Sequence, residues 1–256
     1  LGVGEWAIRL ADDPEFVRRL CDRRRGLGAD GAIALTPVDE VTVRLTYRNS
    51  DGSAGAFCGN ATRCAARAAV EVLGLAQRLV IETGWERTPA VVDGGEVTLD
   101  LPTPGVAPIR PEIAAPEGLS DLMLFDIGVP HLVAEASAVS NLDLVAMGPP
   151  LRAHPTLGAE GANVNFYEVG TGGEVRMRTW ERGVEDETLA CGSGTVAVAL
   201  QVMASRGYRK VTVIPPSGDR LTVEALGEPP VCPTRLTGPA RMVARIDLSA
   251  DFLATI

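Results

Sequence analysis

Residues 58–66 read CGNATRCAA, and residues 191–199 read CGSGTVAVA. Each stretch begins with Cys-Gly, continues with small residues suited to a helix, and has a threonine four residues after the cysteine. The two cysteines are 133 positions apart (191 − 58), and the pairs Thr46-Tyr47 and Thr179-Trp180 recur at the same spacing. We interpret the repeat as an internal duplication that gives two similar domains, each with a strand, a polar turn and a helix that begins at a cysteine.

Hydrophobic periodicity outside the repeat indicates a mixed α/β protein, without the regular alternation of a parallel sheet. An acidic start, an apolar stripe and an Arg-rich end predict a helix over 13–24. Alternating residues predict a strand over 41–47, and an Ala-rich run predicts a helix over 61–73. Proline-rich stretches at 102–116 and 149–155 are typical of linkers or loops.

The composition of the 256 residues narrows the functional classes. A net charge of −9 makes a nucleic-acid or anionic-membrane partner improbable and favours a small molecule. The most apolar window, 189–204, is too polar and too short for a membrane span. Five cysteines, an odd number without a C-x-x-C pair, indicate reduced thiols in the cytoplasm. The chain starts at Leu1 without methionine, and we expect its N-terminus to be incomplete.

Two cysteines at helix N-termini suggest a specific chemistry. The helix dipole and the unsatisfied amides of the first turn favour the thiolate, so each thiol can act as a base. Small residues after each cysteine let the backbone amides approach a carboxylate. A carboxylate held with one sulfur on each side of its α-carbon suits inversion, because a thiolate removes the α-proton and the opposite thiol returns one. The repeat therefore predicts a two-base racemase or epimerase.

The other cysteines, the histidines and the lysine give less support to a different catalytic chemistry. We expect Cys21, Cys64 and Cys232 to be buried structural residues. The two histidines, His131 and His154, adjoin prolines and are predicted to lie in loops, and His131 could tune a thiol. The single lysine, Lys210, opens a predicted strand, which argues against a pyridoxal phosphate enzyme. Metal-ligand spacing is absent, so we expect neither a cofactor nor a metal.

The chain resembles the diaminopimelate epimerase family over nearly its whole length. The matching motifs are LCDR at 20–23, GLGADG at 26–31, RNSDGS at 48–53, CGNATRC at 58–64, GVPH at 128–131, NVNF at 163–166, ERG at 181–183 and ETLACGSG at 187–194. The resemblance implies a cofactor-independent enzyme that converts LL- to meso-diaminopimelate in the synthesis of lysine and peptidoglycan precursors. It also implies a homodimer.

The resemblance implies a fold of two pseudo-symmetric domains, each a barrel-like sheet around a central helix, with the active site in the cleft between them. The expected domains are 1–105, with 238–256 returning to it, and 106–237. Cys58 and Cys191 would be the acid and base thiols, and His131 and Glu181 would tune them. The substrate would be bound by Asn49, Gly59, Asn60, Asn163, Glu181, Arg182, Gly192 and Ser193.

Three departures from the family pattern leave alternatives open, and one of them is the sequence VEDE at 184–187, in a turn that often contains glycine. The family carries Gly-x-Gly-Asn-Asp-Phe near its N-terminus, and residues 1–6 here read LGVGEW. Val129 stands where many members have an asparagine before Pro-His. One alternative is therefore a related amino-acid racemase, independent of pyridoxal phosphate, with a different substrate. The other is an amino-acid-binding protein in which the two cysteines form a redox-switched disulfide.

Overall fold

The computed structural model describes residues 5–55, 58–84 and 86–253. The chain forms two compact units. Unit 1 consists of residues 1–97 and 240–256, and unit 2 consists of residues 98–239. The N-terminal positions 1–4, where the family motif was sought, lie outside the described residues.

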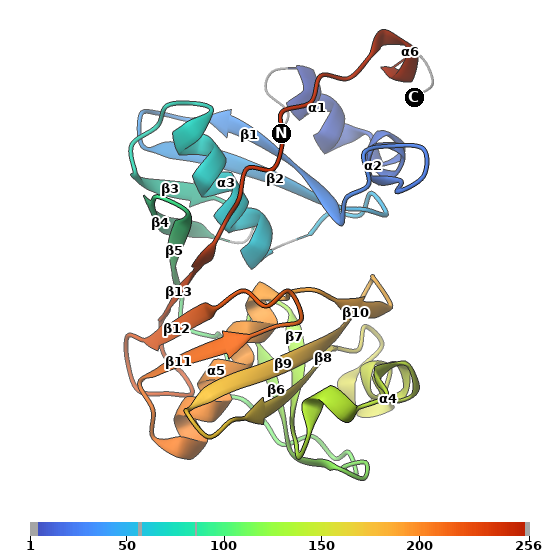
Figure 1. Ribbon diagram of the computed structural model, residues 1–256, viewed down its shortest axis with the longest axis vertical. Helices are drawn as coiled ribbons and strands as arrows, with labels where there is room; N and C mark the ends of the chain where they lie inside the picture. Colours follow the sequence, from blue (N-terminus) through green and yellow to red (C-terminus); the bar gives the residue numbers. More distant parts are fainter. Residues whose placement is uncertain (1–4, 56–57, 85, 254–256) are drawn as a thin grey trace. The chain divides into compact units, whose positions relative to one another are not determined.

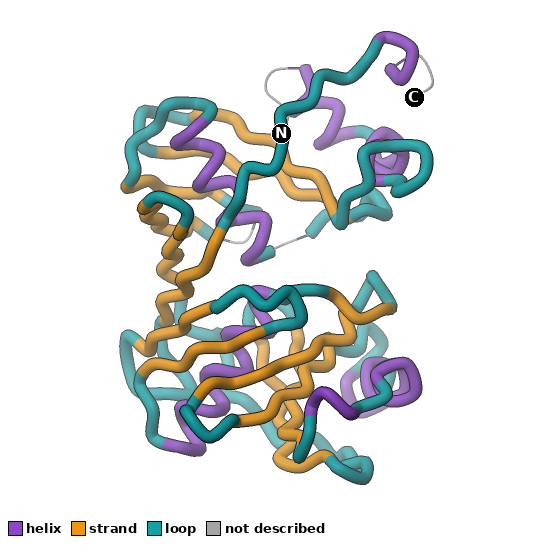
Figure 2. The backbone as a smooth tube through the Cα atoms, in the orientation of Figure 1, coloured by secondary structure: helices purple, strands orange, loops and turns teal. Residues whose placement is uncertain are grey.

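Unit 1 is a mixed sheet covered by helices (Figure 1). Its strand order is β1-β2-β3-β4, in which β2 and β3 are parallel and the other neighbours antiparallel. After β13 of unit 2, the chain runs through a loop to α6 (Figure 2). The elements are α1 (Glu5–Asp12), α2 (Pro14–Cys21), β1 (Gly31–Pro37), β2 (Thr42–Asn49), α3 (Gly59–Glu71), β3 (Arg78–Glu82), β4 (Arg87–Asp93), the start of β5 (Glu96–Leu101) and α6 (Ala250–Leu253).

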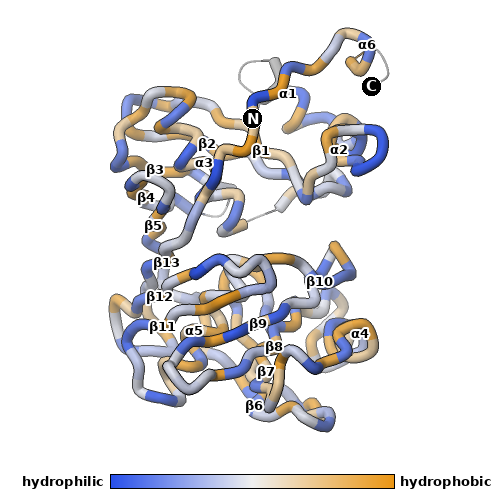
Figure 3. The backbone as a smooth tube through the Cα atoms, in the orientation of Figure 1, coloured by the Kyte–Doolittle hydropathy of each residue, from blue (hydrophilic) through white to orange (hydrophobic). Residues whose placement is uncertain are grey.

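Helix α2 confirms the helix predicted from residue 13, although it ends earlier than expected. The Asp13 carboxylate caps it by accepting from the Phe16 amide at 3.0 Å, and Phe16, Val17 and Cys21 are buried. The helix stops at Cys21 because the next stretch is strongly hydrophilic and contributes nothing to the core (Figure 3). Helix α1, by contrast, was not expected from the sequence.

Unit 2 has the strand order β13-β12-β11-β9-β8-β7-β6, and β10 pairs with the end of β9. The rest of β5 joins this unit, where the Thr98 hydroxyl bonds to that of Thr237 at 2.9 Å. The elements are β6 (Leu119–Asp126), β7 (Pro130–Ala136), α4 (Leu144–Arg152), β8 (Asn163–Val169), β9 (Glu174–Glu181), β10 (Asp186–Thr188), α5 (Gly192–Arg206), β11 (Lys210–Ile214), β12 (Leu221–Ala225) and β13 (Thr234–Pro239), with short 3₁₀ turns η1 (Val139–Asn141) and η2 (Pro155–Leu157).

The sequence repeat corresponds to a repeat of structure. In unit 1, β1 and β2 are antiparallel, α3 follows, β3 lies parallel to β2 and β4 returns antiparallel. In unit 2, β8, β9, α5, β11 and β12 repeat these relations in the same order. Helix α5 contacts strands of both halves of its sheet and is buried from Gly192 to Met203, as expected of a central helix.

The structure corrects two expectations about loops. Pro149 and Pro150 lie in the last turns of α4 and not in a loop. Each proline removes one amide donor from the helix, and Gly148 lets α4 pack directly against the Trp180 ring. His131 lies within β7 and is fully buried, because β7 pairs with β6 on one side and with β8 on the other. Pro130 occupies the first position of that strand, where a missing amide donor is tolerated.

Candidate active site

Cys58 is the N-cap of α3 and is half-buried. Its sulfur accepts a hydrogen bond from the Ala61 amide at 3.4 Å. A thiol in this position is exposed to the positive end of the helix dipole, which favours the thiolate. The structure thus places Cys58 where the sequence predicted it, at the first turn of a helix.

The residues that follow Cys58 are held by a buried arginine. Arg63 donates to the Asn60 side-chain oxygen at 3.0 Å and to the Gly59 carbonyl at 3.3 Å. Only 5% of Arg63 is exposed, so its guanidinium is fixed within the first turn of α3. The amides of Gly59 and Asn60 therefore belong to an ordered helix terminus of the kind that binds anions.

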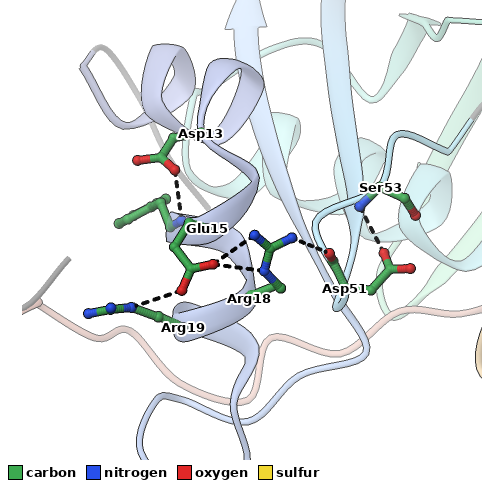
Figure 4. A network of polar contacts seen from close by, with 7 residues as sticks. Asp13, Glu15, Arg18, Arg19, Asp51 and Ser53 are labelled. Carbon is green, nitrogen blue, oxygen red and sulfur yellow. Dashed lines mark hydrogen bonds and ion pairs between the residues drawn. The ribbon is translucent and has the colours of Figure 1, made fainter.

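Asn49 lies at the end of β2, in a turn that is secured to α2. Its side chain accepts from the Tyr47 hydroxyl at 2.7 Å and donates to Ser53 at 2.9 Å. Arg18 of α2 donates to the Asp51 carbonyl at 3.1 Å and is itself held by Glu15 (Figure 4). These bonds give the Asn49 side chain one defined orientation.

A cavity of about 490 Å³ in unit 1 adjoins Cys58. Its walls come from residues 44–48 of β2, the start of α3 and the segment from the end of β3 to the start of β4. The lining includes Arg44, Tyr47, Cys58, Thr62, Glu82 and Arg87. Cys58 is therefore next to a hollow that carries both charged and apolar groups.

Cys191 occupies the equivalent position in unit 2, as the N-cap of α5. It is 5% exposed, and its sulfur lies 3.8 Å from the Ser193 hydroxyl. Gly192 and Ser193 are buried at the first turn of the helix. Gly194 approaches Asn165 so closely that a Cβ there would overlap the amide oxygen of Asn165.

His131 is joined to this helix terminus through Asn165. The Asn165 amide nitrogen lies 3.1 Å from His131 Nδ1 and 3.3 Å from the Leu132 carbonyl, and Thr179 donates to its oxygen at 3.1 Å. Burial lowers the pKa of His131 from 6.5 to about 3, and the charge of Arg182 acts in the same direction. His131 is consequently neutral at physiological pH.

The remaining expected residues of unit 2 cluster at the adjoining strand ends. Asn163 pairs with His131 across β7 and β8, donates to the Pro130 carbonyl at 3.3 Å and accepts from the Arg182 amide at 2.9 Å. Glu181 accepts from the Thr188 hydroxyl at 2.7 Å. The Arg182 guanidinium lies 3.9 Å from Glu160. The Asn163 side chain therefore lies at the backbone of Arg182, which directly follows Glu181 in the chain.

The other cysteines and histidine lie outside these clusters. Cys21 and Cys232 are buried, as predicted, but Cys64 is exposed, because it lies off the buried stripe of α3. His154 begins the exposed turn η2, and Lys210 opens β11, both as predicted. The five cysteines carry thiols and form no disulfides.

Residues 5–55, 58–84 and 86–253 contain neither a cluster of metal ligands nor a helix suited to a membrane. Within these ranges, the structure has no cluster of three or more metal-ligating side chains that could hold an ion. None of the helices described there is both long enough and apolar enough to cross a membrane.

Comparison with known proteins identifies the family. The model of the family "Diaminopimelate epimerase" matches residues 7–99 and 123–243. The chain belongs to the diaminopimelate epimerase family. A diaminopimelate epimerase from Chlorobaculum tepidum is 38% identical over 242 residues, covering 90% of each chain. One from Gemmatimonas aurantiaca is 37% identical over 195 residues, covering 75% of this chain and 70% of the relative.

A solved structure supports the fold independently. A probable proline racemase from Agrobacterium radiobacter matches with a TM-score of 0.65 over 97% of this chain and 88% of its own, at 19% identity. At that identity the likeness concerns the fold alone. The family and fold predicted from the sequence are confirmed, and membership makes the protein an enzyme of the diaminopimelate epimerase class.

Two residues of the site received no role from the sequence. Asn165 is fully buried between His131 and the first turn of α5, and Thr188 holds Glu181. The signal for Asn165 was present, because it is a second polar residue two positions after Asn163 and so lies on the same face of a strand whose first five residues are buried. Thr188 gave no such signal.

Proposed function

We propose that the protein interconverts LL- and meso-diaminopimelate by a two-base mechanism in which Cys58 and Cys191 are the acid and base. The observation that supports the proposal is the equivalence of the two cysteines. Each is the N-cap of the first helix in a repeated strand–helix–strand unit of a chain that belongs to this family.

In the proposed reaction, one cysteine starts as the thiolate and the other as the thiol. The thiolate takes the α-proton, which leaves the electron pair of the broken C–H bond on the α-carbon. The opposite thiol then delivers its proton to the other face of that carbon and becomes the thiolate. No proton or charge is gained or lost, and the configuration of one carbon is inverted.

The α-carboxylate would be bound by the amides of Gly59, Asn60, Gly192 and Ser193. The first turn of each helix presents backbone donors and the positive end of a dipole, and the small size of Gly59, Gly192 and Ser193 leaves room for an anion to approach the amides. Carbanion formation spreads negative charge onto this carboxylate, so fixed donors at the two termini stabilise the transition state more than the substrate.

The distal amino-acid group would be held by Asn49, Asn163, Glu181 and Arg182. A carboxylate acceptor suits its ammonium, and a guanidinium suits its carboxylate. Thr188 restricts the Glu181 side chain, and the backbone amide of Arg182 restricts that of Asn163, before substrate binds. A substrate without the distal group would leave these polar side chains unpaired, which penalises ordinary amino acids.

The proposal extends to the state of the protein in the cell. We propose a homodimer that works in the cytoplasm of its cell, without pyridoxal phosphate or a metal, in the synthesis of lysine and peptidoglycan precursors. The thiols of all five cysteines are consistent with a reducing compartment. Sedimentation equilibrium would test the dimer directly.

Proton NMR in D₂O tests the reaction. Reduced protein should exchange the α-proton of LL-diaminopimelate and produce the meso isomer. A panel of L-amino acids, including proline, serves as the comparison, and we expect no exchange with them. Exchange of another amino acid in place of diaminopimelate would show a related racemase, and binding without any exchange would show a binding protein; either result would overturn the proposal.

A further inference from the structure

The side-chain amide of Asn165 has a single orientation that its surroundings dictate. The Leu132 carbonyl can only accept a hydrogen bond, so the Asn165 atom 3.3 Å from it must be the nitrogen. The Thr179 hydroxyl supplies the matching donor to the amide oxygen at 3.1 Å. Both ends of the amide are therefore assigned, in a site with no exposed surface.

This orientation determines which nitrogen of His131 carries the proton. The Asn165 nitrogen has two hydrogens; one goes to Leu132, and the other points to His131 Nδ1 at 3.1 Å. Nδ1 must accept that hydrogen, and a neutral imidazole with an accepting Nδ1 is protonated at Nε2. A proton on both nitrogens would set two donors against each other.

The opposite nitrogen of the ring has no partner of its own. His131 Nε2 is buried and makes no hydrogen bond among the described residues. Burying an N–H without an acceptor is unfavourable, so its retention in a site of this kind indicates a ligand or reacting group that accepts from it. Because Nε2 is a donor, the acceptor that suits it best is an anion.

We infer that Asn165 is a positioning residue that fixes His131 in its Nε2–H tautomer, so that His131 serves the reaction as a hydrogen-bond donor to an anion and not as a proton acceptor. The inference rests on the proposed function for its catalytic meaning. Asn165 also connects His131 to the helix that Cys191 caps, because it contacts Gly194 at the first turn of that helix.

Nitrogen-15 NMR of protein labelled at histidine tests the tautomer directly. The chain has only two histidines, and His131→Gln assigns their signals. We expect His131 to show a protonated Nε2 and a bare Nδ1 at pH 7 in the free protein. A proton on Nδ1, or on both nitrogens, would overturn the inference. The test needs no substrate, so it stands even if the substrate assignment fails.

Variants then test the role of Asn165. Asn165→Asp replaces the donating nitrogen with an acceptor, and His131 should change to the Nδ1–H form or the imidazolium, with a roughly 100-fold fall in kcat. Asn141→Asp, the same change at an exposed position of unit 2, should alter neither. An unchanged tautomer in folded Asn165→Asp would contradict the inference, and the wild-type spectrum decides the matter if that variant does not fold.

The geometry of the donor gives a second test. A glutamine amide nitrogen reaches the position of Nε2, whereas that of asparagine reaches only the position of Nδ1. His131→Gln should therefore retain kcat within about tenfold of wild type, and His131→Asn should lose about 100-fold. Equal losses would overturn the donor role. If Nε2 is protonated but the protein epimerises no substrate, the tautomer assignment stands. Only the proposed function then fails.

The same spectra identify the anion. A shift of the Nε2–H signal in the free protein as a thiol is titrated would identify a thiolate sulfur as the acceptor. A shift only after meso-diaminopimelate is added would identify the substrate carboxylate. Either result supports a donor role, and a signal that responds to neither would contradict it.

Discussion

The Thr195 hydroxyl donates to the carbonyl of Cys191 at 2.8 Å, and the Thr195 amide donates to the same oxygen at 2.9 Å. In unit 1, Thr62 makes both bonds to the carbonyl of Cys58, each at 2.9 Å. The repeat therefore extends to the way in which each cysteine is fastened to its helix. The proposed reaction uses one acid and one base of the same kind, and it would need two sites built alike.

The first prediction concerns the two cysteines. Replacing either Cys58 or Cys191 with alanine removes one of the two proton-transfer groups, so inversion should fall about 1,000-fold or more in both directions. Conversion of LL- to meso-diaminopimelate, followed by NMR, measures this. Cys64→Ala, an exposed thiol on α3, is the matched control and should retain activity. Normal turnover in both single variants would rule out the mechanism.

The second prediction concerns Gly194. An alanine there would overlap Asn165 and place its Cβ 3.1 Å from the Cys191 sulfur, so the first turn of α5 must move. We expect loss of stability together with a fall in kcat of about tenfold or more.

Gly207 provides the control for that substitution. It ends the same helix with φ +74° and nothing near its Cβ position. Gly207→Ala should cost about 1–2 kcal/mol of stability from backbone strain alone, with kcat preserved in the folded protein. Urea unfolding and kinetics of both variants separate the two effects. A fully active Gly194→Ala would show that the close packing is not needed.

The third prediction concerns Thr188, whose hydroxyl donates to Glu181 at 2.7 Å. A hydrogen bond to a charged group contributes about 1.5–3 kcal/mol, so Thr188→Val should lower kcat/KM for diaminopimelate roughly tenfold or more. Thr188→Ser keeps the hydroxyl and should recover most of the activity. Equal activity in the serine and valine variants would mean that the hydrogen bond does not position Glu181.

The fourth prediction concerns acid stability. The pKa of His131 is about 3 in the folded protein and about 6.5 when unfolded, so below pH 6.5 the unfolded state binds the extra proton. The free energy of unfolding should therefore fall as the pH drops from 6.5 towards 3, by up to about 1.4 kcal/mol for each pH unit. Above pH 6.5 this contribution is complete.

Urea unfolding of wild type and His131→Gln between pH 5 and about 7.5 checks this dependence. The interval avoids most of the carboxylate titration that also weakens the fold in acid. The slope of wild type should be largely absent in the variant. If both proteins lose stability equally over this interval, His131 is not the buried group responsible.

Much of the fold could be predicted because the repeated residues determine the local structure around them. Cysteine, small residues and threonine at fixed spacing specify a helix terminus, and both helices begin directly after the expected cysteines. The strands that carry Thr46 and Thr179 also lie as expected, within β2 and β9. These features depend on a few neighbouring residues, which a sequence displays in full.

The errors occurred where tertiary packing overrode local signals. His131 follows a proline and was expected in a loop, but strand pairing with β6 and β8 places it in the core. Cys64 was expected to be buried as a small apolar residue, yet it faces outwards because positions 61, 65 and 68 of α3 fill the interior. The role of Asn165 depends on contacts with three segments that are distant in sequence, which no local pattern reveals.

The most direct test of the central claim is the fate of the α-proton during the first few per cent of reaction of LL-diaminopimelate in D₂O. If Cys58 and Cys191 act on opposite faces, the meso product should carry deuterium at the inverted carbon, while the remaining LL substrate keeps its proton. A product that retains the original proton would show that a single group both removes and returns it, and would contradict the two-cysteine mechanism.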